Sequence, residues 1–589
     1  MKKVLCLLLC LVMLLGVLVA CGGNETTDKD DDPVTDAPGN ETNKPSGNET
    51  NKPSGNETNK PSGETNKPSG DTDTPGGETN PPDTNTPGGD ETNPPDTNTP
   101  GSDETNSPDT NPGGDDTNPP ETNPPVTPPD SGSTGVTTVD PTISYDPEDF
   151  GNTDGTPKTF TVLVRAGRHA WFHGTDKSTD DVSIAAYKRN KKLNEMYNID
   201  LILLENESSV ATWRTTLDAA DGNIDLAIPD FFWGLEYEGF FINLMRRPEI
   251  HDADPHWIQG WNNNLIINNR LYSLVGDAAL ELMENWYVIF YNRDMAKDLG
   301  YYEDLFDLVD SGKWTVKEML TIMDDFELAL MDNDDSNDVW GLVTDDNHGV
   351  ECLLYSAGLT LLETNRYTNI INNISNTPKN IALTSDITAL RHHSASNIFD
   401  DTARGSKTLK TRNNLFFAEK SFFYATFLLN GKTIKKSAAF DYGVLVLPKY
   451  DVADDYITAS YGVSFFTIPH SALNKRCSAV VLNTMNWLSN TEDERGMGED
   501  RLVYTYYETV VKGQVANIAE DFAMLDTIRN GANYDFGSVV SGAVPLESSF
   551  RKAVNENKSI TITMSEVSKK AEDGILEMMT FYGDPNYAN

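Results

Sequence analysis

A long stretch near the start of the chain has no means of forming a hydrophobic core. Residues 22–140 contain almost no large apolar side chain beyond a few isolated valines. Two motifs repeat there: GNETNKPS recurs every eight residues from Gly39, and ETNPPDTNTPG recurs every thirteen residues from Glu78. Neither repeat has a hydrophobic position to bury, so nothing offsets the entropy that ordering would cost. A fully flexible chain of this length would span about 60 Å on average, and the frequent proline favours extended chain that could reach several times that distance. Residues 21–150 are therefore predicted to be a disordered tether.

The first residues combine a positive start with a short apolar run. Lys2 and Lys3 precede residues 4–20, and the run ends in the sequence LVAC at Cys21. Its length and flanks are typical of a secretory signal rather than of a spanning helix. The LVAC ending resembles the bacterial lipobox, in which the cysteine receives a diacylglycerol and the signal is cut just before it. Residues 1–20 are thus predicted to be a lipoprotein signal peptide and Cys21 the lipidated residue, with an ordinary signal peptide as the alternative.

Charge and cysteine content exclude several classes of protein. The chain carries 91 acidic and 46 basic residues, for a net charge of −45. Nucleic acids and anionic membrane surfaces both attract a basic face, so no nucleic-acid partner is expected. After the signal and Cys21, only Cys352 and Cys477 remain, which is too few for a disulfide scaffold. Two or three acyl chains on Cys21 would hold the protein on the outer face of the cell membrane, and a long tether suits the wall of a Gram-positive bacterium.

The rest of the chain alternates between strand and helix patterns. Apolar, β-branched runs predict strands, and the segments between them have helical periodicity. The predicted order is strand 160–164, helix 182–197, strand 199–204, helix 213–220 and strand 224–229. This alternation predicts a parallel sheet with right-handed crossovers, and such sheets bind ligands beyond the carboxyl ends of their strands. Those ends carry HAWF at residues 169–172 and DFFW at residues 230–233.

Several weak motifs then follow one another in a fixed order. They are DLAI (225–228), LYSLVGD (271–277), WYVIFYNRD (286–294), WTVKEML (314–320), YGVLVLP (442–448) and YGVSFFTI (461–468). In this order and spacing they resemble the extracytoplasmic solute-binding proteins of ABC importers, in the carbohydrate-type group that includes maltose-binding protein. The resemblance covers most of residues 158–500. The segment FAEKSFFY (417–424) is a looser match, and the last ninety residues match only by position.

The resemblance implies an α/β fold of two lobes, the type II periplasmic-binding-protein-like fold, with parallel sheets flanked by helices. It divides the solute-binding region, 151–589, into lobe 1, about 157–278 plus 460–500, and lobe 2, about 286–455 plus 505–589. It also implies that the lobes close on a ligand between them without catalysis. The expected partners are a small-molecule ligand, an oligosaccharide, and the permease subunits of an ABC transporter.

Aromatic and acidic residues near the predicted strand ends and crossings are the candidate ligand contacts. Sugars stack their apolar faces on aromatic rings and exchange hydrogen bonds with polar side chains. The candidates are Trp171, Asp230, Phe231, Trp233, Asp277, Trp286, Tyr424 and Tyr461. For each of them, packing in the core is the alternative.

Motifs for other chemistry are few. The chain contains no HExxH, GxSxG or GxxxxGK[ST] sequence, so zinc protease, hydrolase-elbow and phosphate-loop mechanisms lack their signatures. A glycoside hydrolase needs only two carboxylates and stays open. One constellation resembles a calcium loop, with oxygen side chains at Asp332, Asp334, Ser336 and Asp338 but no closing glutamate. A solvated turn is the alternative there, and no other cofactor is expected.

Three functions follow from these observations. The first is a lipid-anchored, non-catalytic receptor that captures a solute and delivers it to an ABC transporter. The second is a surface-exposed sugar-sensing or adhesion protein that uses the same fold without an importer, which the long tether favours. The third is a secreted enzyme, which no motif in the sequence favours.

Overall fold

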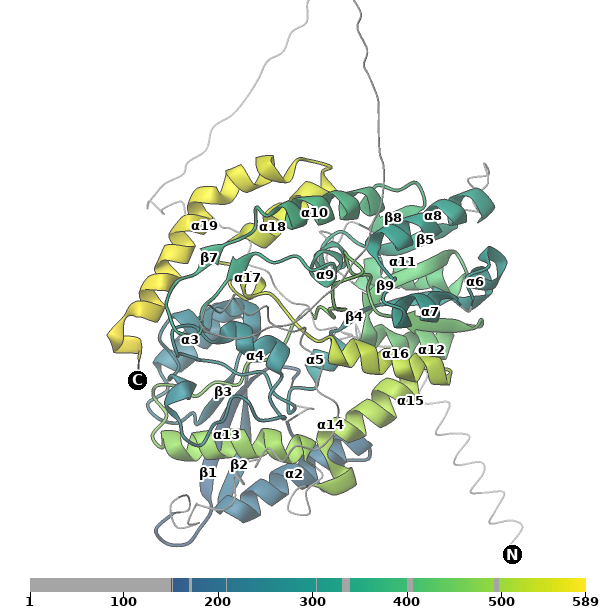
Figure 1. Ribbon diagram of the computed structural model, residues 1–589. Helices are drawn as coiled ribbons and strands as arrows, with labels where there is room; N and C mark the ends of the chain where they lie inside the picture. The colour runs from purple at the N-terminus through teal and green to yellow at the C-terminus, as the bar shows by residue number, and fades with distance from the viewer. Residues whose placement is uncertain are drawn as a thin grey trace, which may run out of the picture. The chain divides into compact units, whose positions relative to one another are not determined.

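Two sheets, flanked by helices, carry the fold (Figure 1). The computed structural model describes residues 150, 152–168, 172–207, 209–302, 304–330, 339–399, 406–460, 462–491 and 497–588. The first sheet contains β1 (Lys158–Arg165), β2 (Ile199–Asn206) and β3 (Leu226–Ile228) in the order β2-β1-β3. The second contains β4 (Tyr287–Asn292), β5 (Trp340–Asp345), β8 (Ser396–Phe399), β9 (Ser421–Phe427) and β10 (Tyr442–Leu445) in the order β10-β4-β9-β5-β8. A short ribbon of β6 (Leu362–Glu363) and β7 (Asn372–Asn373) lies apart from both.

The first sheet follows the local sequence signals. Its three strands are parallel, and β1 is buried on both faces from Val162 to Arg165. Helix α2 (Asp181–Tyr197) connects β1 to β2, and the side chain of Asp180 caps it by accepting a hydrogen bond from the Ser183 amide at 2.8 Å. Helix α3 (Val210–Asp218) connects β2 to β3. The predicted strand–helix alternation and parallel pairing are confirmed.

A segment from much later in the chain extends this first sheet. Thr467 pairs antiparallel with Ala227 of β3, and the amides and carbonyls of the two residues exchange hydrogen bonds of 3.0 and 3.1 Å. On its other side the same segment pairs antiparallel with Leu274, through Phe466. The first sheet therefore has three parallel strands, then an antiparallel segment at 464–467, then Leu274.

The second sheet repeats this pattern. Strands β8, β5 and β9 are parallel, whereas β4 is antiparallel to both β9 and β10. Strand β4 follows the passage of the chain out of the first lobe, and segment 464–467 follows the passage back. The predicted parallel sheets thus each contain one antiparallel member, because each sheet accepts the segment that arrives from the other lobe.

Three crossings connect the lobes. The first, at residues 276–286, and the second, near residues 446–463, pair with each other where Trp286 bridges Ser460 and the Tyr287 amide donates to the Ala459 carbonyl at 3.0 Å. The third leaves α13 (Lys475–Asn490), which packs on α2. It continues through α14 (Leu502–Thr505), a π-helix at Tyr506–Lys512 and α15 (Gly513–Val515). It then reaches α16 (Ala519–Asn530), which packs against β10.

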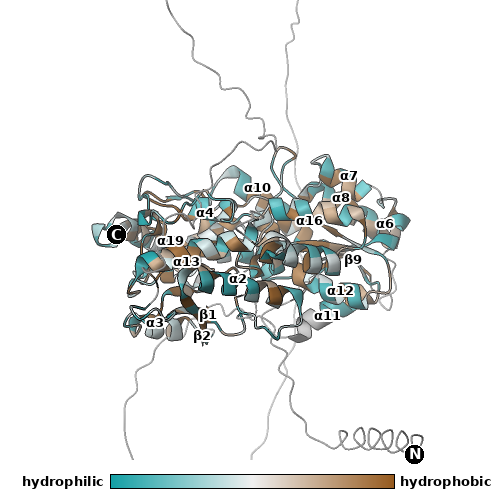
Figure 2. Ribbon diagram, turned by 90° about the horizontal axis from the view of Figure 1, so that it is seen from below, coloured by the Kyte–Doolittle hydropathy of each residue, from teal (hydrophilic) through white to brown (hydrophobic). Residues whose placement is uncertain are grey.

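Further helices pack around the two sheets and the first crossing. They are α4 (Gln259–Leu265), α5 (Glu281–Glu284), α6 (Arg293–Leu299), α7 (Asp304–Asp310), α8 (Val316–Leu330), α9 (His348–Ser356), α10 (Pro378–Arg391), α11 (Ser406–Phe417) and α12 (Gly431–Ser437). Figure 2 shows hydrophobic residues concentrated around the strands and hydrophilic ones on helices such as α10 and α12. Cys352 and Cys477 are buried free thiols. Among the described helices, none has the length and apolar composition required to span a bilayer.

The C-terminal helices contact both lobes. Helix α18 (Leu546–Asn555) packs on α9 and α10 beside the second sheet, with α17 (Phe536–Val539) preceding it. The end of α19 (Ile560–Gly583) instead reaches the first lobe, where the Phe581 ring lies 5.1 Å from that of Tyr272 and Arg270 donates to the Phe581 carbonyl at 2.9 Å. The boundary expected for lobe 2, about 505–589, therefore encloses a stretch that contacts both lobes.

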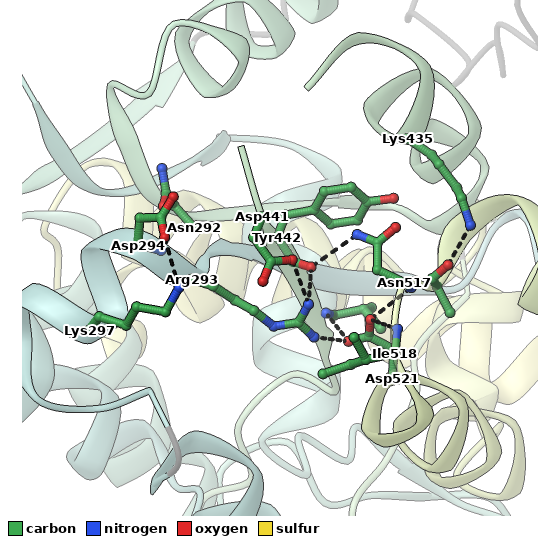
Figure 3. Close-up of polar contacts among 12 residues, drawn as sticks. Asn292, Arg293, Asp294, Lys297, Lys435, Asp441, Tyr442, Asn517, Ile518 and Asp521 are labelled. Atoms are coloured by element: carbon green, nitrogen blue, oxygen red, sulfur yellow. Dashed lines mark hydrogen bonds and ion pairs between the residues drawn. The ribbon is translucent and has the colours of Figure 1, made fainter. Parts of the chain in front are cut away.

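A buried ion pair fastens α16 to the second sheet (Figure 3). Arg293 follows β4 directly, and its Nη2 lies 2.7 Å from Oδ1 of Asp521 on α16; both side chains are at most 1% exposed. The Nη1 of Arg293 also donates to the Tyr442 carbonyl at 2.7 Å and to Asp441 at 2.9 Å. The guanidinium thus joins β4, β10 and α16 at one point.

The Asp521 carboxylate is satisfied on its other side by the backbone. Its Oδ2 accepts from the amides of Asn517 and Ile518 at 2.9 and 3.2 Å, and its Oδ1 accepts from the Val444 amide at 3.3 Å. The Asn517 and Ile518 amides lie just before α16, at the end where helical N–H groups lack partners within the helix, whereas the Val444 amide belongs to β10. Asp521 therefore both caps α16 and docks it on β10.

Replacing Asp521 by Ala should lower the free energy of unfolding by about 3–5 kcal/mol, because it leaves the Arg293 charge buried without its buried partner. The control is Asp441→Ala, which removes the 42% exposed partner of the same arginine and should cost no more than about 1 kcal/mol. Urea unfolding of both variants measures the difference, and equal losses would contradict the assignment of Asp521 as the anchor.

Candidate functional site

The predicted site residues do not all fall within the described part of the chain. Cys21, Trp171, Tyr461 and the calcium candidates Asp332, Asp334, Ser336 and Asp338 lie outside the described residues. Lipidation at Cys21 and calcium binding at 332–338 stay predictions. The other candidates lie within the described residues, but in different surroundings.

Asp230 lies in a buried charged cluster at the carboxyl edge of the first sheet. It forms an ion pair with Arg165, the last residue of β1, and only 1% of its side chain is exposed. Glu281 of the first crossing is also buried and accepts from the Ser464 amide at 2.8 Å. Burial raises the pKa of the Glu281 carboxyl, while Arg168 acts in the opposite direction. Asp230 is therefore engaged by Arg165, and a ligand would have to compete for it.

The second sheet has a matching pair at its own carboxyl edge. Asp345, the last residue of β5, pairs with Arg412 of α11 and accepts hydrogen bonds from the Tyr287 hydroxyl at 3.0 Å and the Gly349 amide at 2.9 Å. Burial acts to raise the pKa of Asp345, but Arg412, His348 and the Gly349 amide together outweigh it, and the pKa lies below its ordinary value. In both lobes, a buried arginine–aspartate pair therefore lies at the carboxyl edge of the sheet.

Phe231 belongs to an aromatic stack that joins the lobes. Its ring centre lies 5.7 Å from that of Trp261 and 5.8 Å from that of Tyr534. Tyr534 stacks on Trp261 at 4.9 Å with an angle of 5° between the rings, and on its other side it lies 4.8 Å from Tyr355 of α9. A C-terminal tyrosine therefore fills the space between a first-lobe ring and a second-lobe ring.

Tyr424 also lies in the interior. It is fully buried on β9, and its hydroxyl donates to the Asn413 side chain at 2.7 Å. Like Phe231, it has no surface open to a ligand in this structure, so contact would require movement of the surrounding residues.

Trp233 lines a cavity of about 500 Å³ between the first lobe and the C-terminal helices. Its ring packs edge-on against Trp213 at 5.3 Å. The cavity is mostly apolar, with walls from Tyr237, Met578 and Phe581, and an Arg214–Glu238 pair, with Nε and Oε2 2.6 Å apart, among its polar lining residues.

Asp277 and Trp286 line a second cavity, of about 290 Å³, where the crossings meet. Its walls come from residues 255–260, from the first crossing, and from the ends of α13 and α16. Two indoles, Trp257 and Trp286, form part of the lining. The polar side chains that line it are Gln259, Asp277, Asn490, Arg529 and Asn530. Because its walls belong to the crossings, any rotation of one lobe against the other changes its shape.

The charged groups of this second cavity are unusual for so acidic a chain. The Asp277 carboxyl accepts a hydrogen bond of 2.5 Å from the Asn490 amide, and burial raises its pKa to about 7 against the opposing effect of Arg529. The Arg529 guanidinium lies over the ring of Tyr507, 4.7 Å from its centre. Arg529 was not among the predicted contacts, because it lies in the C-terminal stretch that carries no motif.

The arrangement suits binding rather than hydrolysis. The Trp257 and Trp286 indoles are each 1% exposed, so a ring-shaped solute can stack on them only when the surrounding residues move, whereas amide, carboxyl and guanidinium groups can hydrogen-bond its substituents. Of the residues that line the second cavity, only Asp277 carries a carboxyl group, whereas glycoside hydrolysis ordinarily uses a pair of them.

One cluster on the second lobe has the residue types of a metal site. Carboxylate oxygens of Asp324 and Glu327 and a ring nitrogen of His393 lie within 4.8 Å of one another. However, the Ala395 amide donates to Nδ1 of His393 at 3.1 Å, and Nε2 lies 3.0 Å from Asp324. With Nδ1 accepting, a neutral ring carries its proton on Nε2. Nε2 therefore donates to Asp324 and is not free for a metal ion.

Comparison with known proteins gives distant structural likenesses only. No model of a known protein family matches the chain, and no curated protein matches it. Among solved structures, it is similar to UgpB from Mycobacterium tuberculosis in complex with glycerophosphocholine, with 13% identity, a TM-score of 0.45, and 72% of this chain and 98% of that chain covered. It is also similar to the ABC substrate-binding protein Lmo0181 from Listeria monocytogenes in complex with cycloalternan, with 14% identity and a TM-score of 0.44, over 72% of this chain and 99% of that chain. The sugar-binding protein MalE from Xanthomonas citri has 11% identity and a TM-score of 0.49, over 72% of this chain and 100% of that chain. At this distance, the fold rests on the sheet order of the chain itself.

The Asp277 carboxyl should make stability depend on pH. Its pKa in the folded protein, about 7, lies above its ordinary 3.8, so the folded state binds the extra proton and loses stability as pH rises from about 4 to about 7. Asp277→Asn should therefore leave stability unchanged at pH 4 and raise it at pH 8, by up to about 4 kcal/mol. Urea unfolding of both proteins at the two pH values measures this. A variant that is no more stable than the wild type at pH 8 would show that the carboxyl is not held in a desolvated place.

Proposed function

We propose that this protein is a lipid-anchored receptor on the outer face of the cell membrane. It captures a small solute, a sugar or oligosaccharide, and delivers it to the permease of an ABC transporter. The observation that carries the proposal is the cavity of Asp277 and Trp286, because its walls are the segments that cross between two lobes of equivalent topology.

The position of this cavity supports capture by closure. A hinge made of crossing strands absorbs a rotation between lobes with small changes at a few residues. The first and second crossings pair at Trp286 and Ser460, and Trp286 itself lines the cavity. A solute bound there would contact the hinge directly and favour the closed arrangement of the lobes.

The chemistry of the cavity supports a sugar. Its volume is at the lower end of the range for small-molecule sites, which suits one or two sugar rings. Trp286 and Asp277 are the predicted contacts that we propose to bind the first ring. Trp233 lines the neighbouring cavity of about 500 Å³ and would contact a longer oligosaccharide. Trp171 and Tyr461 remain proposed contacts, whereas Asp230, Phe231 and Tyr424 would support the site from the interior.

The N-terminal sequence supports the membrane attachment. The LVAC ending places a cysteine at position 21 after an apolar run, and residues 22–140 provide a long polar connection to the folded part. A receptor that serves a permease must stay near the membrane, and a lipid anchor with a tether provides this without a spanning helix. The same length of tether favours the second candidate, a sugar-sensing or adhesion protein that works without an importer.

A sugar panel tests the binding proposal. A ligand present at a hundred times its Kd should stabilise the folded protein by about 2.7 kcal/mol, visible as a rise in Tm. Asp277→Ala should then weaken binding of that sugar about tenfold to a hundredfold by calorimetry, because a buried polar contact is lost. Trp233→Ala is the comparison, and it should affect oligosaccharides more than single sugars. Loss of all binding in Trp233→Ala with unchanged affinity in Asp277→Ala would move the site to the other cavity. A panel without any Tm shift would contradict the receptor.

Membrane attachment depends on the thiol of Cys21. Cys21→Ser should release the protein from the membrane fraction or leave an unprocessed precursor, since serine cannot form the thioether. Fractionation followed by immunoblotting measures the distribution, with Cys477→Ser as the control for loss of a thiol. A variant that stays in the membrane fraction in its processed form would refute the lipid anchor.

A further inference from the structure

We infer that the solute bound in the cavity of Asp277 and Trp286 carries a carboxylate on its sugar ring, as a uronic acid does, and that Arg529 binds this carboxylate. The inference rests on the proposed receptor function and names the substrate class of the same site.

Arg529 offers an unused donor fork. It stands one residue before the end of α16 and lines the cavity. The Tyr507 ring covers one face of its guanidinium, and stacking of this kind leaves the N–H groups at the edge of the plane free to donate. Among the described residues, no hydrogen bond or ion pair within 4 Å uses those N–H groups. A planar fork without an acceptor, in a cavity, matches the two oxygens of a carboxylate.

The helix that carries Arg529 is held rigidly. Asp521 lies two turns earlier on α16 and is fixed by Arg293 and by three backbone amides. The ring beneath the guanidinium is fixed as well, since the Tyr507 hydroxyl donates to Asp526 at 2.7 Å. The fork is therefore positioned before any ligand arrives, and preorganised donors lose little entropy on binding.

The other titratable groups around the site do not cancel this cation. Asp277 of the first crossing faces two residues, Arg529 of α16 and Asn490 of α13. Its raised pKa of about 7 leaves it half protonated at neutral pH. His256, whose backbone carbonyl accepts from the Asp277 amide, has its pKa lowered to about 4 by burial and is neutral. The cavity is thus positive below pH 7, although the whole chain has a net charge of −45.

A ligand that has both a ring and an anionic substituent fits this cavity, and an acidic sugar has both. The indoles of Trp257 and Trp286 line the cavity, each 1% exposed, and would contact a ring once the crossings shift to admit it, and Arg529 provides a partner for an anionic substituent. A protonated Asp277 can donate a hydrogen bond to the same carboxylate, whereas an ionised Asp277 repels it. Affinity for a uronate should therefore fall as pH rises through 7.

The test compares pairs of sugars that differ only in the acid group: glucuronate with glucose, and galacturonate with galactose, as single sugars and as dimers. Calorimetric titration of the full-length protein at pH 6 should give at least tenfold tighter binding of a uronate than of its neutral partner. Arg529→Gln should abolish this preference, and Arg529→Lys should retain part of it. Arg501→Gln is the matched control, because Arg501 also stacks on a tyrosine, at 4.4 Å from the Tyr504 ring, but does not line the cavity.

The pH arm separates a carboxylate contact from a general charge effect. Uronate affinity of the wild type should fall by about tenfold from pH 6 to pH 8, and Asp277→Asn should remove this fall. Neutral sugars that bind at least as tightly as uronates, with Arg529→Gln unchanged, would overturn the inference while leaving the receptor intact. Failure of every sugar, neutral and acidic, to bind would overturn the receptor proposal itself.

Discussion

Each sheet of this protein is completed by a segment that arrives from the other lobe. Strand β4 enters the second sheet between β9 and β10, and residues 464–467 enter the first sheet between β3 and Leu274. Without the exchange, β3 and β9 would present unpaired edges, and buried backbone groups without partners are costly. The lobes therefore cannot be built independently, and the segments that complete them necessarily run side by side at the crossing, where Trp286 bridges Ser460. The position of the cavity at this crossing is a consequence of how the sheets are closed.

Buried ion pairs fix the positions of the sheet edges and of α16, which the exchange of segments between the lobes does not determine. Arg165–Asp230 and Arg412–Asp345 hold the carboxyl edges of the two sheets, and Arg293–Asp521 holds α16. Buried pairs of this kind contribute little net stability compared with apolar packing, but they penalise any arrangement that separates the partners. Their effect here is positional. The Asp521 carboxylate fixes the start of α16, and the same helix carries Arg529 to the cavity at its other end.

Local signals made much of the first lobe predictable from sequence. The strand at 160–164 and the capped helix after it are specified by residues close to them in sequence. The motifs at 271–277 and 286–294 located the first crossing because they contain Leu274, which pairs in the first sheet, and strand β4 of the second sheet. The rest depends on distant partners. Arg293 and Asp521 are 228 residues apart, so no local pattern could show that α16 docks on β10, that Arg529 lines the cavity or that Tyr534 stacks on Trp261. The same limit applies to Phe231, which follows the third strand but packs against Tyr534, and to Tyr424, which lies in the middle of β9 and is fully buried.

The stack of Trp261, Tyr534 and Tyr355 decides how freely the lobes can move. Rotation of one lobe against the other must separate at least one of its ring contacts, and each such pair contributes about 0.5–1.5 kcal/mol beyond its buried area. Micromolar binding of a solute supplies about 8 kcal/mol. A stack of this strength biases the empty protein toward the arrangement described here, yet it is weak enough for opening to be populated. Because Tyr534 follows the 529–532 segment that lines the second cavity, a shift of the stack also moves a wall of that cavity. Ligand contact and lobe rotation are therefore coupled through a single short stretch of chain.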